Sequence, residues 1–510
     1  MPGKKTVNTI VLVIYLTIFS KFFGLIRDIV IGAQFGTGIE SDAYFAAYRM
    51  SVTLFLSIGT AITAITIPLV VTNLQGDYEG LINRLITRML LITGGLVLAG
   101  EILAPVFTPW VAVGFEGEKL ALTITLVRIL LPVLLLVPIV YLLISVLQAQ
   151  ERFVITSLVS LPHNVIIVAY LVVFSRTFGI MGLGVASLLG WLGQLLFLGT
   201  GARRQGFRFR FLPRGYTDEI RDYFKAVFPV LVASGVYSVN VLVDSAIAST
   251  LDHGHLAALN FANIAYTALA TTLIFGISAV LFPKFSDWGA RKEMAALGQG
   301  VAEALKVMVF LFLPVIFGVL SVNRELVSLI YERGSFDGHS VALTAGALGF
   351  YTLGILGFSF QEIGAKVFYA LKDTRTPFIF SGLSVVVNIV LDLVLVGFMG
   401  INGLALATSI AVTLNGIMLL VLAKRKIGVV PLEGLFIRTL KIIISSGAMA
   451  LGVVAFLKWF EDSSRWIKLP GGIFLGILLY WIIGKILDIE EISYIREEIV
   501  GSLKKRRARG

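Results

Sequence analysis

The chain consists of apolar segments separated by short polar breaks or by breaks that contain Gly and Pro. Each segment approaches the roughly 20 residues that an α-helix needs to cross the hydrocarbon core of a bilayer. Residues 378–399, for example, contain Asp392 as their only charged side chain. We therefore predict an all-α polytopic membrane protein with about fourteen transmembrane helices, near residues 7–33, 42–72, 85–108, 122–147, 154–175, 181–200, 224–249, 257–283, 303–323, 341–369, 378–397, 402–423, 437–457 and 470–487.

Composition supports this assignment and excludes an ordinary soluble protein. Of the 510 residues, 57% are hydrophobic and only 14% are charged, whereas soluble domains carry about 25% charged residues. The first apolar segment follows Lys4 and Lys5, and no small-residue cleavage site follows it, so we expect a membrane helix and not a signal peptide. Cysteine is absent, which excludes disulfides and thiolate chemistry.

The net charge of +11 indicates membrane topology better than nucleic-acid binding. Lys and Arg concentrate in alternate gaps between the predicted helices, including Arg203, Arg204, the run 424–426 and the tail 504–509. Loops rich in Lys and Arg remain in the cytoplasm. We therefore expect a multi-pass protein of the cytoplasmic membrane with both termini in the cytoplasm, basic runs on membrane lipids, and no nucleic-acid partner.

An internal duplication divides the chain. Phe115-Glu-Gly117 recurs as Phe336-Asp-Gly338, and the same offset relates Gly179-Ile-Met-Gly-Leu183 to Gly400-Ile-Asn-Gly-Leu404. Six helices per copy is an even number, so both copies insert in the same direction, as in transporters that bind substrate between their halves and alternate access by rocking. We predict an N-lobe at 1–215, a C-lobe at 216–430, and two further helices with a basic tail at 431–510.

Three cations lie inside predicted spans, too deep to reach the membrane surface easily: Lys21, Arg27 and Arg49. Buried charge costs several kcal/mol unless it faces protein or water, so such residues are candidates for binding. They either line a water-filled cationic cavity or form internal ion pairs with Asp28 or Asp42. The corresponding part of the second copy offers polar residues without positive charge, namely Asn240, Asp244, Asn260 and Asn263.

Catalytic and cofactor motifs are absent from the sequence. The four histidines lack the spacing of a zinc site, and no Gly-rich loop ends in Gly-Lys-Ser or Gly-Lys-Thr, which argues against built-in ATP hydrolysis. We therefore expect a transporter and not an enzyme, without a metal or bound cofactor. A coupling ion or the membrane potential would supply the energy.

The sequence resembles the MurJ/MviN family at several motifs, which are Ser20-Lys-Phe-Phe-Gly24-Leu-Ile-Arg27-Asp28, Ser41-Asp42-Ala43, Asn240-Val-Leu-Val-Asp244, Tyr331-Glu-Arg-Gly334 and Phe368-Tyr-Ala-Leu-Lys-Asp373. The resemblance implies the fold of the MOP exporter superfamily, with two six-helix lobes around a central cavity and two extra helices beside a hydrophobic groove. It also implies a bacterial inner-membrane flippase for undecaprenyl-pyrophosphate-linked peptidoglycan precursor, with cell-wall synthesis proteins as candidate partners. Lys21 takes a place where many members have arginine, and Arg27 and Asp42 resemble the family's cavity arginine and nearby aspartate.

Two departures from the family bear on the substrate: Phe55 and Ile264 stand where many members have arginine. The alternatives are a polysaccharide-repeat flippase or a cation-coupled exporter of the same superfamily, a membrane-embedded transferase acting on lipid carriers, and a non-transporting scaffold. Exporters of the cation-coupled type rely on buried carboxylates, whereas the deep charge of the first half is mainly basic. A transferase would need clustered acidic residues or histidines at a membrane face, which the sequence does not offer.

Overall fold

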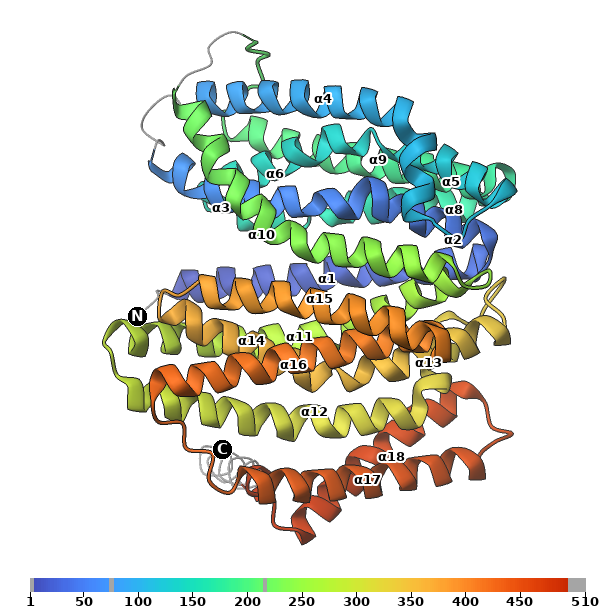
Figure 1. Cartoon of the computed structure of the whole chain (residues 1–510), viewed down its shortest axis with the longest axis vertical. Helices are drawn as coiled ribbons and strands as arrows, with labels where there is room; N and C mark the ends of the chain where they lie inside the picture. Colours follow the sequence, from blue (N-terminus) through green and yellow to red (C-terminus); the bar gives the residue numbers. More distant parts are fainter. Residues whose placement is uncertain (1–3, 73–77, 214–217, 494–510) are drawn as a thin grey trace, which may run out of the picture. The chain divides into compact units, whose positions relative to one another are not determined.

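The computed structural model describes residues 4–72, 78–213 and 218–493, and every regular element in these ranges is a helix (Figure 1). The helices are α1 (Lys4–Phe35), α2 (Ile39–Tyr48), the π-helix η1 (Arg49–Thr53), α3 (Leu54–Thr72), α4 (Tyr78–Val111), α5 (Gly117–Leu130), α6 (Val133–Ala149), α7 (Phe153–Ser157), α8 (Ser160–Val173), α9 (Ser175–Arg204), α10 (Asp218–Ser249), α11 (His255–Ala290), α12 (Met294–Tyr331), α13 (Gly338–Leu353), α14 (Ile355–Ala370), α15 (Arg375–Met399), α16 (Ile401–Ile427), α17 (Leu435–Trp459) and α18 (Arg465–Ile486). The basic tail at 504–509 lies outside the described residues.

The predicted spans correspond to these helices, so the all-α polytopic fold is confirmed. Over the described residues, twelve helical segments are long and apolar enough to cross a membrane, and the bent pair α13 and α14 would make thirteen. The remaining predicted span is α1, which is a helix of 32 residues. Most observed helices run several residues beyond the predicted ends, because the hydrogen-bonded helix continues where the apolar pattern stops at polar side chains.

Several predicted spans are built from two or three consecutive helical pieces. The span at 42–72 contains the π-helical turn Arg49–Thr53, and π-turns inside α-helices occur frequently at functional sites. The span at 122–147 is interrupted at Pro132, and the span at 341–369 at Gly354. Proline lacks the N–H that would continue the helical bonding, which accounts for the first interruption.

The internal duplication recurs in the backbone at two places. Gly179 has φ 53° and ψ −147°, and its counterpart Gly400 has φ 56° and ψ −135°, a conformation that is essentially restricted to glycine. Glu151 and Lys372 also correspond, with φ of 60° and 59°. The residue after each one donates its backbone N–H to a matching carbonyl, in the bonds Arg152 to Leu147 and Asp373 to Phe368, at 2.8 and 2.9 Å.

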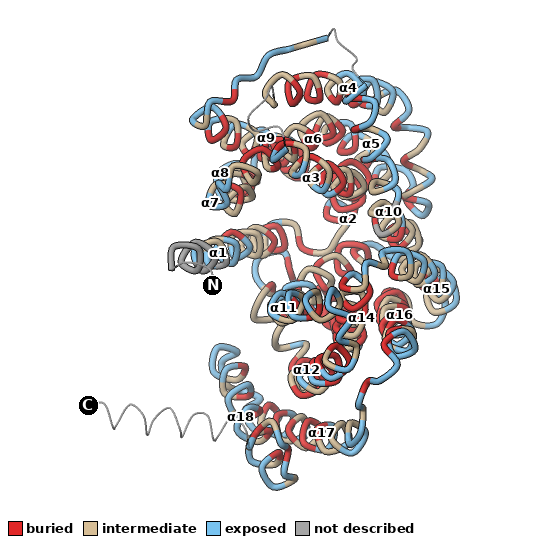
Figure 2. The backbone as a smooth tube through the Cα atoms, turned by 90° about the vertical axis from the view of Figure 1, so that its left-hand side faces the viewer, coloured by how far each residue is buried: buried red, intermediate tan, exposed pale blue. Residues whose placement is uncertain are grey.

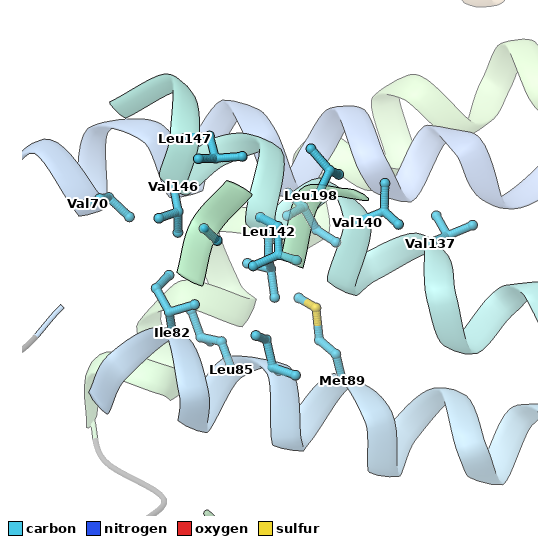
Figure 3. Close-up of a cluster of buried hydrophobic side chains, with 14 of the residues drawn as sticks. Val70, Ile82, Leu85, Met89, Val137, Val140, Leu142, Val146, Leu147 and Leu198 are labelled. Carbon is cyan, nitrogen blue, oxygen red and sulfur yellow. The ribbon is translucent and has the colours of Figure 1, made fainter. Parts of the chain in front are cut away.

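The chain forms two compact units, one of residues 1–257 with 333–337 and one of residues 258–332 with 338–510. In the first unit, α3, α4, α6 and α9 pack around a hydrophobic core, part of which is shown in Figure 3. Its members include Ile82, Leu85, Val137 and Leu142, all fully buried. Buried positions of these helices face their neighbours (Figure 2). The division by sequence duplication into 1–215, 216–430 and 431–510 stays a prediction.

The second unit has its own core, formed by α11, α12, α14 and α16. Phe285, Phe312 and Phe368 are almost completely buried there. The two C-terminal helices, α17 and α18, pack against each other and against α12. Tyr480 donates its hydroxyl hydrogen to the carbonyl oxygen of Phe310 at 3.1 Å, which fastens α18 to α12.

Candidate functional site

Arg27 is held in a fixed orientation on α1. Its Nε and Nη2 lie 2.9 and 2.8 Å from Oδ1 of Asp28, and its Nη1 donates to Oδ1 of Asn164 on α8 at 3.2 Å. The hydroxyls of Ser20 and Ser160, 2.6 Å apart, form a second bond between the same two helices. The Arg27 side chain remains 24% exposed while that of Asp28 is 8% exposed. Arg27 is therefore paired with one of the two expected carboxylates and is still accessible to an anion.

Lys21 differs from Arg27 in having no such partner. Its side chain is exposed on α1, and it forms no ion pair with any described residue. Six residues separate it from Arg27, which corresponds to about 9 Å along the helix axis. Lys21 is thus an unneutralised cation within a segment predicted to span the membrane.

Asp42 belongs to a different arrangement from Arg27. It is 1% exposed at the start of α2, and its Oδ2 accepts hydrogen bonds from Nζ of Lys119 and from the backbone N–H of Gly254, each at 2.7 Å. Its Oδ1 accepts a bond from the backbone N–H of Ala257 at 2.8 Å. The carboxylate therefore serves as a cap for the first turn of α11, where unpaired N–H groups favour negative charge.

Lys119 completes this buried cluster. Its side chain is 6% exposed, and its Nζ lies 3.4 Å from Nδ1 of His253 and 3.9 Å from the centre of the Phe115 ring. A charge buried this deeply is stable only when it is paired and hydrogen-bonded. Asp42, predicted as a substrate residue or as a counter-ion for the membrane cations, is here the counter-ion of Lys119.

Arg49 occupies the π-helical turn and is 8% exposed. Its Nη1 donates to the hydroxyl of Ser245 on α10 at 2.7 Å. Two other predicted site residues, Asn240 and Asp244, also lie on α10, and both are buried. These residues belong to the first unit together with Lys21, Arg27 and Asp42, whereas Asn260 and Asn263 lie on α11 in the second unit. The fold thus brings six of the eight predicted site residues into one unit.

Sequence reasoning missed Asn164, a partner of Arg27, and Lys119, the partner of Asp42. Asn164 is a polar residue inside a predicted span, which is a signal for a packing or binding role. Lys119 precedes the predicted span at 122–147, so it was indistinguishable from a loop residue. Lys119 follows Asp42 by 77 residues in the sequence, so no local pattern would pair them.

A buried aromatic and polar layer lies next to Arg27. His163 follows Ser160 on α8 by one helical turn, is 4% exposed, and meets the Trp191 ring edge-on at 6.0 Å between ring centres. Tyr44 and Ser187 are joined by a hydrogen bond of 2.9 Å between their hydroxyls. These contacts join α8 to α9 and α9 to α2.

A cavity in the first unit is lined by residues without charged groups. It has a volume of about 760 Å³ and is lined mainly by apolar residues of α5, α8 and α9, including Ile129, Val173 and Leu189. Phe55 and Ile264, the two departures from the family's arginines, are partly buried apolar side chains. In residues 4–72, 78–213 and 218–493, no three or more His, Asp or Glu residues lie together as a metal site would require. The positively charged residues among the predicted site residues are Lys21, Arg27 and Arg49.

Comparison with known proteins identifies the family. The sequence profile of the family described as "Lipid II flippase MurJ" matches residues 31–469. A Rhizobium tropici protein named "Probable lipid II flippase MurJ" is 26% identical and aligned over 95% of this chain and 94% of its own length. Proteins of the same name from Bdellovibrio bacteriovorus and Vibrio cholerae are 24% and 26% identical, each covered over 97% of its length.

Solved structures agree on the fold. A lipid II flippase MurJ in an inward closed conformation superposes with a TM-score of 0.80 at 24% identity, over 93% of this chain and 98% of the other. An inward-facing multidrug resistance transporter of the MATE family in the MOP superfamily gives a TM-score of 0.68 at 14% identity, over 82% of this chain. Because the family profile covers most of the sequence and the fold agrees, this chain, a multi-pass membrane protein, belongs to the MurJ family.

Proposed function

We propose that this protein moves lipid II, the undecaprenyl-pyrophosphate-linked precursor of peptidoglycan, across the cytoplasmic membrane by alternating access. Support comes from the family assignment and from relatives of that name that align over nearly their whole length. The protein then acts as a transporter and not as an enzyme, its substrate is a lipid-linked sugar, and both termini are cytoplasmic.

The observation that carries the proposal is the pair of accessible cations on α1. A diphosphate cannot cross hydrocarbon without replacement of its hydration, and Lys or Arg side chains supply charge-assisted hydrogen bonds for this purpose. Lys21 is exposed and unpaired among the described residues, and Arg27 is partly exposed and pre-oriented by Asp28 and Asn164. Arg49 is deeper, at 8% exposure, and contributes mainly to the local potential.

The two accessible cations have different roles in this scheme. Arg27 uses three nitrogen atoms to bond two neighbours, which requires the planar fork of a guanidinium. Lys21 acts as a point charge on a flexible chain and makes no fixed bond of this kind. The polyprenyl tail remains in lipid while the headgroup passes.

Complementation tests the proposal. In a host depleted of its own lipid II flippase, this gene should restore growth and the outward exposure of lipid II. Lys21→Gln, Arg27→Gln and Arg49→Gln combined should abolish both, with a loss of about tenfold or more for each accessible cation, because hydrogen bonds to charged groups contribute about 1.5–3 kcal/mol. Arg176→Gln, at an exposed cation on α9, is the matched control and should remain active.

Two conservative variants separate charge from geometry. Lys21→Arg should keep full flipping, whereas Arg27→Lys should lose most of it although it keeps the charge. Full activity of the triple variant, with normal protein levels, would reject the assignment of these residues. Failure of the unmodified gene to expose lipid II would reject the proposed substrate.

A further inference from the structure

A small polar cavity lies in the second unit, where α12 ends and α18 begins. Its volume is about 210 Å³, and side chains from α12, α13 and the segment around the turn between α17 and α18 line it. Sites that enclose a drug-sized ligand have volumes of about 300–1,000 Å³. The cavity therefore suits a single headgroup whose remainder lies outside.

Arg465 is a fixed donor at this cavity. Its Nη1 contacts Oγ and O of Ser328, both at 3.3 Å, and O and Oε2 of Glu332, at 3.2 and 3.0 Å. These contacts fasten the start of α18 to the end of α12. A guanidinium has five N–H donors, and in the described part of the chain the Nε and Nη2 of Arg465 make no hydrogen bond. With 45% of its side chain exposed, Arg465 offers these donors to an anion.

Two further cations line the same cavity. Arg324 is exposed on α12, and among the described residues it forms no ion pair. Lys468 donates from Nζ to the carbonyl oxygen of Glu461 at 2.9 Å, which leaves two of its three protons free. Glu332 is neutralised by Arg465, and Glu325 contributes a second negative charge to the lining of the cavity. Three cations and two carboxylates leave a net charge of +1, which matches one phosphodiester.

Exposed tryptophans place the cavity at a membrane surface. Trp459 ends α17 and is 87% exposed, and Trp466 lies in the first turn of α18 and is 67% exposed. Tryptophan concentrates at the level of lipid headgroups, where its ring is apolar and its N–H reaches water. The three helices α12, α17 and α18 all qualify as membrane spans. The shared end of these helices, and the cavity with it, therefore lies at phosphate depth.

We propose that this cavity binds the phosphodiester headgroup of an anionic phospholipid. Arg465 donates to the phosphate oxygens through Nε and Nη2, and Arg324 with Lys468 provides the surrounding positive charge. The acyl chains lie against exposed apolar side chains of α18 such as Ile467 and Phe474, which are 65% and 70% exposed. The bound lipid stabilises the attachment of α17 and α18 to α12. This inference is independent of the transported substrate.

Lipid binding to the purified full-length protein tests this inference. Native mass spectrometry in neutral detergent would compare phosphatidylglycerol with phosphatidylcholine of the same acyl chains. We expect the first lipid to bind better, and Arg324→Ala with Lys468→Ala to reduce that preference roughly 25-fold if each residue contributes as a basic residue does at an anionic membrane surface. Arg176→Ala is the matched control because it removes an exposed cation from the other unit.

Thermal unfolding provides a second measurement. Phosphatidylglycerol should raise the midpoint of the unmodified protein and of Arg176→Ala, and should raise that of the double variant no more than phosphatidylcholine does. Added salt should weaken the effect, because exposed charges are screened. An unchanged preference for phosphatidylglycerol in the double variant would overturn the inference. So would equal binding of both lipids by the unmodified protein.

Discussion

The pair of Asp42 and Lys119 provides the sharpest test of how the first unit is held together. Asp42 is 1% exposed and accepts hydrogen bonds from the Lys119 ammonium and from the backbone N–H groups of Gly254 and Ala257. Asp42→Asn keeps the shape of the side chain but removes its charge. The Lys119 ammonium then remains buried without a counter-ion.

The size of the effect follows from that unpaired charge. Breaking a buried ion pair by removing one partner costs about 3–5 kcal/mol. Lys119→Met should cost less, because two backbone N–H groups still donate to the Asp42 carboxylate. The double variant Asp42→Asn with Lys119→Met contains no unpaired charge. It should therefore be more stable than the sum of the single losses predicts, by about 1 kcal/mol or more.

The unfolding free energies of the four proteins in this double-mutant cycle would be measured in mixed micelles. They would give the coupling free energy between Asp42 and Lys119. The exposed pair of Asp287, on α11, and Arg291, directly after it, is the matched control, since these side chains are 53% and 64% exposed. Such a surface pair should show a coupling of about 0.5 kcal/mol or less. Hydrogen exchange supplies a local measurement, because Asp42→Asn should accelerate exchange at Gly254 and Ala257.

Additive losses in the cycle would refute the reasoning. They would mean that Asp42 and Lys119 do not share a buried interaction energy in the folded protein. Unchanged hydrogen exchange at Gly254 and Ala257 in Asp42→Asn would show that the carboxylate does not cap α11. Either result would return Asp42 to the set of residues available for substrate.

Two further predictions concern the ends and contacts of helices. The pKa of Asp373 is lowered from 3.8 to about 2 by hydrogen bonds that Lys426 and, to a smaller extent, the backbone N–H of Thr376 donate. This carboxylate therefore contributes stability above pH 4 that is lost as the pH falls toward 2. Thermal unfolding should therefore show a smaller loss between pH 4 and 2 for Asp373→Asn than for the unmodified protein, and equal losses would contradict the assignment. Gly190→Ala should destabilise the first unit by about 1–3 kcal/mol, because its Cβ would lie 2.5 Å from Nδ1 of His163. Gly199→Ala on the same helix meets no atom within 4 Å and should be neutral or slightly stabilising, so equal midpoints for the two variants would contradict the packing.

Much of the fold could be predicted from the sequence because membrane helices have a distinctive apolar composition. A segment that must satisfy its backbone inside lipid is helical and apolar, so the hydrophobic pattern alone locates it. The interruptions within the spans could not be predicted in this way. The break at Gly354 and the π-turn at Arg49 leave the apolar pattern unbroken, since they alter backbone hydrogen bonds and not side-chain polarity.

The candidate site was predictable as a set of charges and not as a set of contacts. Lys21, Arg27 and Arg49 stand out because charge is rare in apolar segments. Their partners do not stand out: Asn164 and Ser245 are ordinary polar residues of other helices, brought to the cations by helix packing. Only Asp28, adjacent to Arg27, was within reach of sequence reasoning, and the ion pair between them is present.

Ion pairing with aspartates determines how much of the positive charge predicted for the site is left without a counter-ion. Asp28 neutralises Arg27, and Asp42 neutralises Lys119, so each buried carboxylate of α1 and α2 is matched to one cation. Among the cations predicted for the site, Lys21 is then both exposed and unmatched in the described part of the chain. In the proposed function, an anionic headgroup that approaches α1 would meet the unpaired Lys21, whereas at Arg27 it would share the guanidinium with Asp28. Such a site would attract a diphosphate without holding it in the most favourable arrangement, which suits a transporter that must also release what it binds.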